Sequence, residues 1–151
     1  MGIAVNELNT FLQEDVDQVL ESVEQITGVT HEQILSSKRN RFIVDARKIL
    51  SVVIRTHLKL TCFETGKIVN KDHTSVIHYE RMHPTHMGEP EYRRLYSAVC
   101  GTFLIRKSVQ DEERLQDQFL KLQRSTKRLL TSLEGSGKIL NLGMEEIKNS
   151  A

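Results

Sequence analysis

The sequence contains no tryptophan, only two prolines and two cysteines, and no long apolar run. Two cysteines are too few for a disulfide scaffold, so we expect reduced, partly buried thiols. The longest uncharged apolar-rich stretch, residues 49–54, is far shorter than the roughly 20 residues that a membrane-spanning helix needs. No basic region or long apolar stretch follows Met1. The sequence therefore predicts no secretory signal, no membrane span and a cytoplasmic protein.

Basic side chains are also absent from the first 37 residues, although the chain as a whole has a net charge of +1. Residues 1–37 carry seven acidic side chains, whereas residues 38–59 carry seven basic side chains and one acidic side chain. This division favours a polyanion-binding surface beside a solvated acidic helix. Mutual neutralisation of neighbouring charged helix faces explains the same pattern equally well, and charge alone does not decide between the two.

Apolar residues recur at steps of three and four along the chain, and no alternating strand pattern competes with this helical period. The sequence therefore predicts an all-α fold. Gly28 is predicted to end the first helix, and Thr30 is predicted to cap the N-terminus of the second. Pro84 and Pro90 predict a loop over residues 84–90, because proline disfavours helix in the residue before it. The expected helices cover residues 8–26, 31–36, 42–58, 62–68, 72–82 and 91–134.

Helical wheels divide two of these helices into an apolar and a polar face. In the 42–58 helix, Phe42 falls on the apolar face, whereas Lys48 and Ser51 fall on the polar face. In the 72–82 helix, Val76 and Ile77 point inward. The residues expected to point outward there are Lys71, Ser75, His78 and Met82.

The last predicted helix carries an apolar stripe that Thr126 interrupts. Its members, spaced by three and four residues or their sum, are Leu115, Phe119, Leu122, Leu129 and Leu133. The stripe is shorter than three heptads, which favours a helix packed on its own domain or on a partner over an independent coiled coil. We expect a domain over residues 1–104, a helical extension over 105–134 and a flexible tail over 135–151.

The sequence offers no catalytic, nucleotide-binding or metal-binding motif that meets its chemical requirements. Residues 135–138 resemble the end of a phosphate-binding loop, but Ser132 and Ile139 stand where that loop needs Gly and Ser or Thr. Zinc needs three or four converging ligands. The four clustered histidines do not share one helical face; they are His73, His78, His83 and His86. We therefore expect no metal, no cofactor and no enzymatic activity.

The most specific motif lies at residues 69–78, where a short helix and a turn precede a helix that opens on Lys-Asp-His-Thr. Asp72 suits the positive end of the helix dipole. The same side chains can read bases, because aspartate accepts a hydrogen bond from cytosine and the threonine methyl contacts thymine. Periodicity alone places His73 among the packing residues. An ordinary capped helix in a bundle is the alternative interpretation.

A basic loop at residues 36–41 precedes the 42–58 helix and suits phosphate contact or insertion of an arginine into a minor groove. Ile34–Arg41, Asp45–Lys48 and Lys71–His78 together resemble the C-terminal DNA-binding domain of the bacterial replication initiator DnaA. The resemblance extends over about residues 15–104. Where this family carries Gly-Gly-Arg before its Asp-His signature, the chain has Val69-Asn70-Lys71.

The resemblance implies a helix-turn-helix bundle, of the type also found in the Trp repressor, that binds double-stranded DNA. It implies that Arg39 enters the minor groove, with Lys38 and Arg41 at the neighbouring backbone. The residues implied at base edges in the major groove are Lys71, Asp72, His73 and Thr74. Those implied at phosphates are Arg55, Ser75 and His78.

The sequence thus predicts a non-enzymatic protein that binds specific double-stranded DNA sites, similar to the DnaA origin-box reader but without its ATPase module. We expect a role in the initiation or regulation of replication, or in transcription control, in a phage or mobile element and hence in a host cytoplasm. The alternative is a structural or protein-interaction protein that uses the same bundle. In that case residues 105–134 would dock a protein partner or a second copy of the chain.

Overall fold

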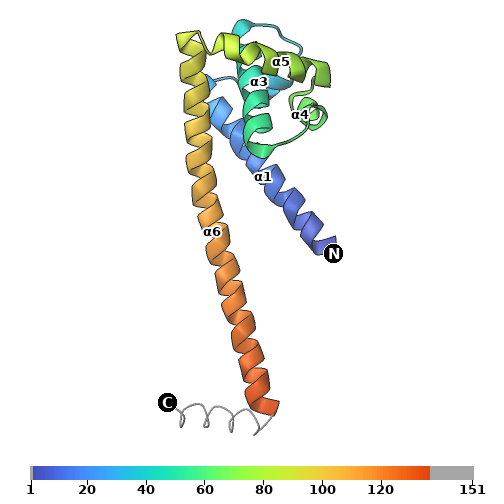
Figure 1. The fold of residues 1–151 in the computed structure, drawn as a ribbon, viewed down its shortest axis with the longest axis vertical. Coiled ribbons are helices and arrows are strands. Elements are labelled where there is room, and N and C mark those ends of the chain that lie inside the picture. Colours follow the sequence, from blue (N-terminus) through green and yellow to red (C-terminus); the bar gives the residue numbers. More distant parts are fainter. Residues whose placement is uncertain (1, 137–151) are drawn as a thin grey trace. The chain divides into compact units, whose positions relative to one another are not determined.

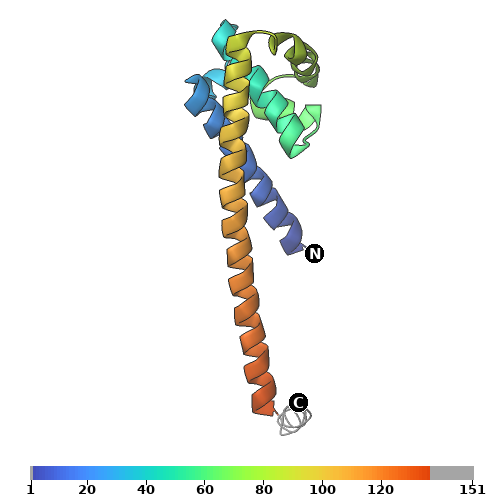
Figure 2. The same cartoon turned by 60° about the vertical axis from the view of Figure 1, so that its left-hand side comes forward.

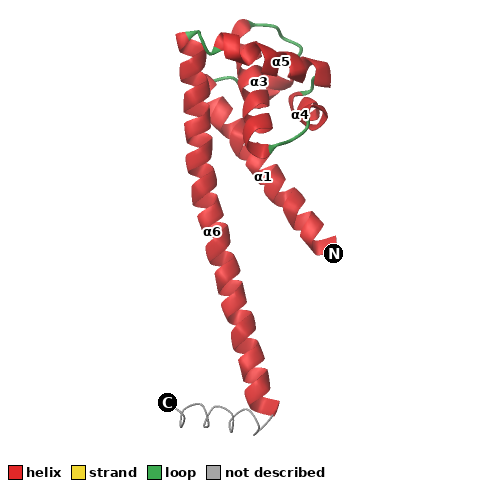
Figure 3. Cartoon of the chain, viewed as in Figure 1, coloured by secondary structure: helices red, strands yellow, loops and turns green. Residues whose placement is uncertain are grey.

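The computed structural model describes residues 2–136, which form helices and short connections with no strand among them (Figure 3). The predicted all-α class is confirmed. By backbone packing the chain divides into two compact units, one ending at Ser108 and one beginning at Val109. No helix of residues 2–136 combines the length and the apolar character needed to cross a membrane.

Six α-helices and one π-helical segment, η1, make up the described chain (Figure 1). In chain order they are α1 (Gly2–Thr27), α2 (His31–Leu35), α3 (Arg41–Val53), η1 (Ile54–Leu58), α4 (Cys62–Val69), α5 (His73–His86) and α6 (Pro90–Ser136). Gly28 ends α1 at a φ of +73°, a left-handed conformation that glycine adopts at little cost. Thr30 and Thr61 begin α2 and α4 with reciprocal capping boxes.

Helix α3 is the centre of the first unit and contacts α1, α2, α4 and α5 (Figures 1 and 2). The core around it is built mainly from branched aliphatic side chains, including Val19, Val23, Ile34, Ile49, Val53, Val76 and Val99, together with Phe103. Because α3 is surrounded, its two predicted faces are partly wrong. Lys48 and Ser51 are buried, whereas Phe42 is 67% exposed.

The predicted loop at residues 84–90 is mostly wrong. Helix α5 continues through Pro84 to His86, and only three residues separate it from α6. Proline at this point removes one hydrogen bond from the final turns of the helix, where few bonds remain to be lost. Pro90 is the first residue of α6, a position at which the missing N–H costs nothing.

The acidic side chains of α1 find basic partners on α6 within the first unit. The Asp15 carboxylate lies 2.7 Å from the Lys107 ammonium, and the Glu21 carboxylate lies 3.2 Å from the Arg106 guanidinium. Neutralisation therefore does occur, but between α1 and α6. The basic segment at residues 38–59 does not supply these partners.

The second unit, as far as it is described, is the remainder of α6 from Val109 to Ser136. Its apolar side chains are largely exposed, among them Leu115, Phe119, Leu122 and Leu129. The predicted flexible tail at residues 135–151 lies, from residue 137 onward, outside the described residues.

At Gly66, helix α4 packs closely against the turn that leads into α5. A Cβ atom placed there would lie 2.6 Å from the carbonyl oxygen of Lys71 and 3.4 Å from the backbone nitrogen of His73. The first of these distances is far inside van der Waals contact, so a side chain at residue 66 requires a backbone shift. Glycine here allows the turn between the two helices to pack directly on α4.

We predict that Gly66→Ala lowers the free energy of unfolding by about 1–3 kcal/mol, because the added methyl group overpacks against backbone atoms. The matched control is Gly101→Ala, since a Cβ at that helical position meets nothing within 4 Å. That change should raise stability by about 0.5–1 kcal/mol. Urea unfolding of both variants measures the difference, and equal effects of the two would contradict the packing argument.

Candidate nucleic-acid interface

The turn between α4 and α5 depends on Asn70. Its φ of 53° lies in the left-handed region, which asparagine tolerates better than most residues, and it ends α4. The Lys71 N–H donates to the Gly66 carbonyl at 2.9 Å. The Asn70 amide also donates to the Leu35 carbonyl at 3.1 Å. Asparagine therefore supplies the conformation usually provided by glycine and also ties the turn to the end of α2.

Arg47 of α3 holds the basic loop in place from inside. Arg47 is 2% exposed, and its Nε donates to the Ile34 carbonyl at 2.8 Å. One terminal nitrogen donates to the Ser36 carbonyl at 2.8 Å and to the Lys38 carbonyl at 3.4 Å. Burying a guanidinium is costly unless acceptors surround it. These carbonyl oxygens meet that need and fix the loop leading to α3.

Lys71 joins this loop to the start of α5. Its ammonium donates to the Ser36 carbonyl at 3.2 Å, the same oxygen that accepts from Arg47. Burial and the nearby charges of Arg47 and Arg39 lower the pKa of Lys71. Three cations thus converge where the loop meets the helix, and a bound anion would relieve their repulsion.

A hollow of about 580 Å³ lies between the basic loop and α5; we call it the loop–α5 hollow. Its lining residues are Ser37, Arg39, Val44, Arg47, Lys71, Thr74, Ser75, His78 and Tyr79. Five of the ten predicted site residues are among them, although Arg39 and Lys71 are 32 positions apart in the sequence. The structure therefore brings the two basic elements of the sequence to one concave surface.

Asp72 and His73 line an adjoining hollow of about 350 Å³ on the α4 side, together with Lys67. The Asp72 carboxylate lies 2.7 Å from Nδ1 of His73 and accepts a hydrogen bond from the Thr74 hydroxyl at 3.2 Å. The His73 side chain is 50% exposed, so the packing position expected from periodicity is wrong. Ile77, expected to point inward, is also exposed. The first turn of α5 presents its polar side chains outward.

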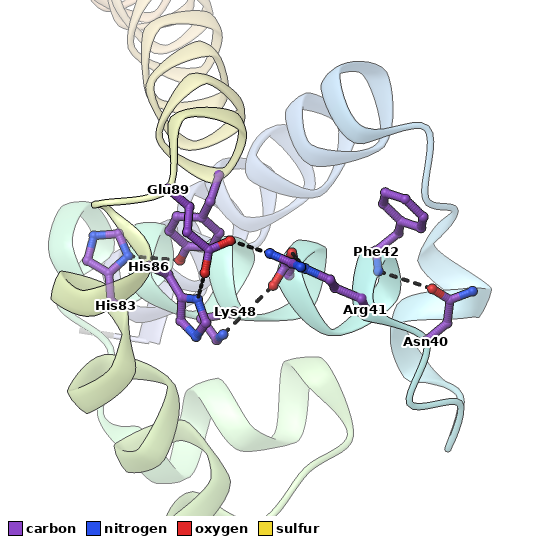
Figure 4. A network of polar contacts seen from close by, with 9 residues as sticks. Asn40, Arg41, Phe42, Lys48, His83, His86 and Glu89 are labelled. Carbon is purple, nitrogen blue, oxygen red and sulfur yellow. Dashed lines mark hydrogen bonds and ion pairs between the residues drawn. The ribbon is translucent and has the colours of Figure 1, made fainter.

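Arg41 lies apart from this surface, at a network that joins the start of α3 to the turn between α5 and α6 (Figure 4). Its guanidinium pairs with Glu89, whose carboxylate also bonds Nδ1 of His86 at 2.9 Å. Asp45 lies 3.8 Å from both Arg41 and Lys48. Arg41 is exposed but lines neither hollow, so its contacts here are internal to the protein.

Arg55 is also engaged within the protein. Its Nε donates to the Glu80 carboxylate at 2.8 Å and another guanidinium nitrogen donates to the Leu60 carbonyl at 2.6 Å. The hydrogen bond to Glu80 raises the pKa of Arg55. Lys38 is exposed in the loop and, like Arg55, lines neither hollow. The phosphate role of Arg55 stays a prediction, and it would require exchange of the Glu80 contact.

Sequence reasoning did not single out Arg47, Asn70 or Lys67 for this surface. Arg47 had a visible signal, because it lies four residues after Ile43 and three before Leu50 on the apolar stripe of its helix. A cation at such a position must be buried among acceptors. Asn70 had a weaker signal in its place directly after a predicted helix, where the left-handed conformation is common.

The described residues contain no group of three or more His, Cys, Asp or Glu side chains arranged to hold a metal ion. The polar side chains of the two hollows are cations, an amide, hydroxyls, imidazoles and the Asp72 carboxylate. This is the donor-rich chemistry that binds phosphate and base edges.

Comparison with known proteins identifies the segment that carries this surface. Residues 16–82 match the family described as bacterial DnaA protein helix-turn-helix. The chromosomal replication initiator proteins DnaA of Kosmotoga olearia and Thermotoga petrophila are 32% and 34% identical over 62 residues. Each match covers 41% of this chain and 14% of the relative's length.

We predict that Arg47→Met lowers the free energy of unfolding by about 1–3 kcal/mol and loosens the basic loop, because the carbonyls of Ile34 and Ser36 lose their donor. Urea unfolding reports the first effect, and faster amide hydrogen exchange over residues 36–41 reports the second. Lys59→Met removes the same charge from an exposed side chain and should change stability by less than about 0.5 kcal/mol. Unchanged exchange in the Arg47 variant would contradict the role assigned to this residue.

Two half-buried histidines make the first unit sensitive to pH. Nδ1 of His83 lies 2.9 Å from the Tyr92 hydroxyl, and the rings of His57 and Phe103 lie 5.8 Å apart. Burial, and then the charge of Lys48, lower the pKa of His83; burial also lowers that of His57. The folded protein therefore holds both rings in their neutral form more strongly than the unfolded chain does.

We predict that stability is full above the unfolded histidine pKa of about 6.5 and falls as the pH drops through this value, because protonation then favours unfolding. Thermal unfolding between pH 7.5 and 5.5 measures the loss. This window lies above the range in which carboxylates titrate. The double variant His57→Gln, His83→Gln should flatten the dependence, while exposed His31→Gln should leave it intact. A wild-type midpoint that is constant across the window would contradict this assignment.

Proposed function

With residues 16–82 carrying a helix-turn-helix of the DnaA type, we propose that this protein binds specific sites on double-stranded DNA and catalyses no reaction. The observation that carries the proposal is the loop–α5 hollow. There, basic residues from two separate segments converge beside the exposed first turn of α5. This combination suits simultaneous contact with a groove and with its flanking phosphates.

In this proposal α5 is the recognition helix and its first turn enters the major groove, as in other helix-turn-helix proteins. Asp72 organises that turn by holding the His73 ring and the Thr74 hydroxyl. A carboxylate has lone pairs beyond those two contacts, so it can still accept from cytosine. When Nδ1 of a neutral His73 donates to Asp72, its Nε2 is left as an acceptor. The Thr74 methyl can contact thymine.

The basic loop supplies the second part of the contact. Arg39 is exposed and lies on the same hollow as Lys71. An arginine beside a recognition helix can enter the adjacent minor groove, whose potential is most negative where the groove is narrow. Within the described residues Lys38 and Arg39 form no ion pair, so their charges are available to DNA.

We infer that the phosphate contacts come mainly from polar residues beside α5. Ser75 and His78 lie on the loop–α5 hollow, and Lys67 lies on the neighbouring one. These residues are placed to flank a helix in the groove. Arg41 and Arg55 pair with Glu89 and Glu80, so their predicted contacts with the DNA backbone would require exchange of these partners.

The biological process is part of the same proposal. The curated relatives are replication initiators by name, which supports a role in the initiation or regulation of replication. Transcription control would use the same surface on operator-like sites. A protein-interaction role for the bundle is the second candidate, and the largely exposed second unit favours it.

The test is selection of binding sites from random duplex DNA, followed by affinity measurements on the selected site. Asp72→Ala and Thr74→Ala should each relax the preference at one base-pair position, at a cost of about 1–3 kcal/mol. With about five phosphate contacts, the logarithm of affinity should fall against the logarithm of salt concentration with a slope of about −4 to −5. Box-like A·T-rich sites would support a replication role.

Lys59→Ala is the matched control, because this exposed cation lines neither hollow. It should leave affinity and preference nearly unchanged. The proposal fails if the wild-type protein does not bind duplex DNA at moderate salt. It fails equally if binding is indifferent to Arg39→Ala and His73→Ala.

A further inference from the structure

The second unit exposes a stripe of large apolar side chains along α6. Leu115, Phe119, Leu122 and Leu129 are 66%, 59%, 65% and 65% exposed, respectively. Their spacing of four, three and seven residues places them on one side of a helix, and three of them line a single open apolar hollow. An apolar stripe of this size is costly to leave in water and is typical of a surface that binds a partner.

The charges beside this stripe have an order that points to its occupant. Residues 109–120 carry four acidic side chains and one basic one, a net charge of −3. Residues 121–136 carry four basic side chains and one acidic one, a net charge of +3. The helix is therefore its own electrostatic complement when a second copy runs in the opposite direction. A parallel second copy would bring acidic residues against acidic ones and basic against basic.

We propose that residues 109–136 pair with the same residues of a second copy of this chain, in antiparallel orientation. The most symmetric register sets Phe119 of one copy beside Leu122 of the other, near the point where the charge changes sign. It then sets Leu115 beside Thr126. Thr126 interrupts the stripe, and in this register a leucine rather than a second threonine covers it.

The pairing surface contains polar residues that limit its strength. Glu112 and Thr126 stand at positions of the stripe that an ideal coiled coil fills with apolar side chains. The described part of the second unit, residues 109–136, offers only four heptads. We therefore expect a reversible dimer, whose formation depends on protein concentration.

The first experiment measures the mass of the full chain against concentration by analytical ultracentrifugation. Leu122→Gln should weaken dimerisation on the order of 100-fold, because each pair loses two apolar contacts. Glutamine is a good helix former, so the helix itself is kept. Thr131→Gln is the matched control, since Thr131 is exposed and lies nine residues from Leu122, on the opposite side of the helix. It should leave the dimer intact.

The second experiment tests the orientation. A Leu115→Cys chain is mixed with a Thr126→Cys chain under mild oxidation, with the wild-type chain as the control for the native Cys62 and Cys100. The antiparallel pair gives the mixed 115–126 disulfide. Cross-links only between identical positions would indicate a parallel pair and overturn the proposal.

Two further outcomes would also overturn it. The first is a chain that stays monomeric at every concentration reached. The second is a monomer that dimerises only after deletion of residues 137–151, which would assign those residues, themselves partly apolar, as the occupant of the stripe. The proposal does not depend on DNA binding, so a failure of the DNA experiments leaves it standing and its own failure leaves the proposed function unaffected.

Discussion

The basic loop owes its position to one buried cation. The Arg47 guanidinium donates to one carbonyl in α2 and to another directly after it. Loop conformations that turn these oxygens away would leave a charge without acceptors in the core. The Ser36 carbonyl also accepts from Lys71. A single arginine on the central helix therefore connects the core, the loop and the first turn of α5. The candidate interface keeps its conformation because the core holds this arginine in place.

The basic side chains of residues 38–59 fall into two groups: some make contacts within the domain, and the others remain at the surface. Arg47 and Arg55 hold carbonyls and a carboxylate within the domain, and Lys48 is buried beside Asp45. The cations left at the surface next to α5 are few, with Arg39 and Lys71 the best placed. Much of the positive charge of this segment is thus engaged within the domain, and contacts made by a few well-placed cations matter more than bulk attraction.

The helices were predictable from the sequence because their apolar periods and capping residues act locally. The failures have tertiary causes. Lys48 is buried because α3 is covered on nearly all sides, which no wheel of a single helix reveals. Pro84 is accepted because its helix ends two residues later. At the interface, the motif located the first turn of α5, but periodicity misplaced His73, because a residue at a helix end projects past the neighbours that would cover it. The convergence of Arg39 with Lys71 depends on a carbonyl contact that has no sequence signature.

Asn70 and Lys71 have a consequence for the kind of DNA site that the proposed function allows. Both residues donate hydrogen bonds to carbonyls at the end of α2. These bonds hold the basic loop and the start of α5 in a fixed relative position. Their two footprints on DNA then keep a fixed offset. One base pair inserted between these footprints would move one of them by about 3.4 Å and rotate it by roughly 34° around the duplex. The domain would therefore discriminate between sites by the length of the spacer between the two footprints, even where it contacts none of the spacer's bases.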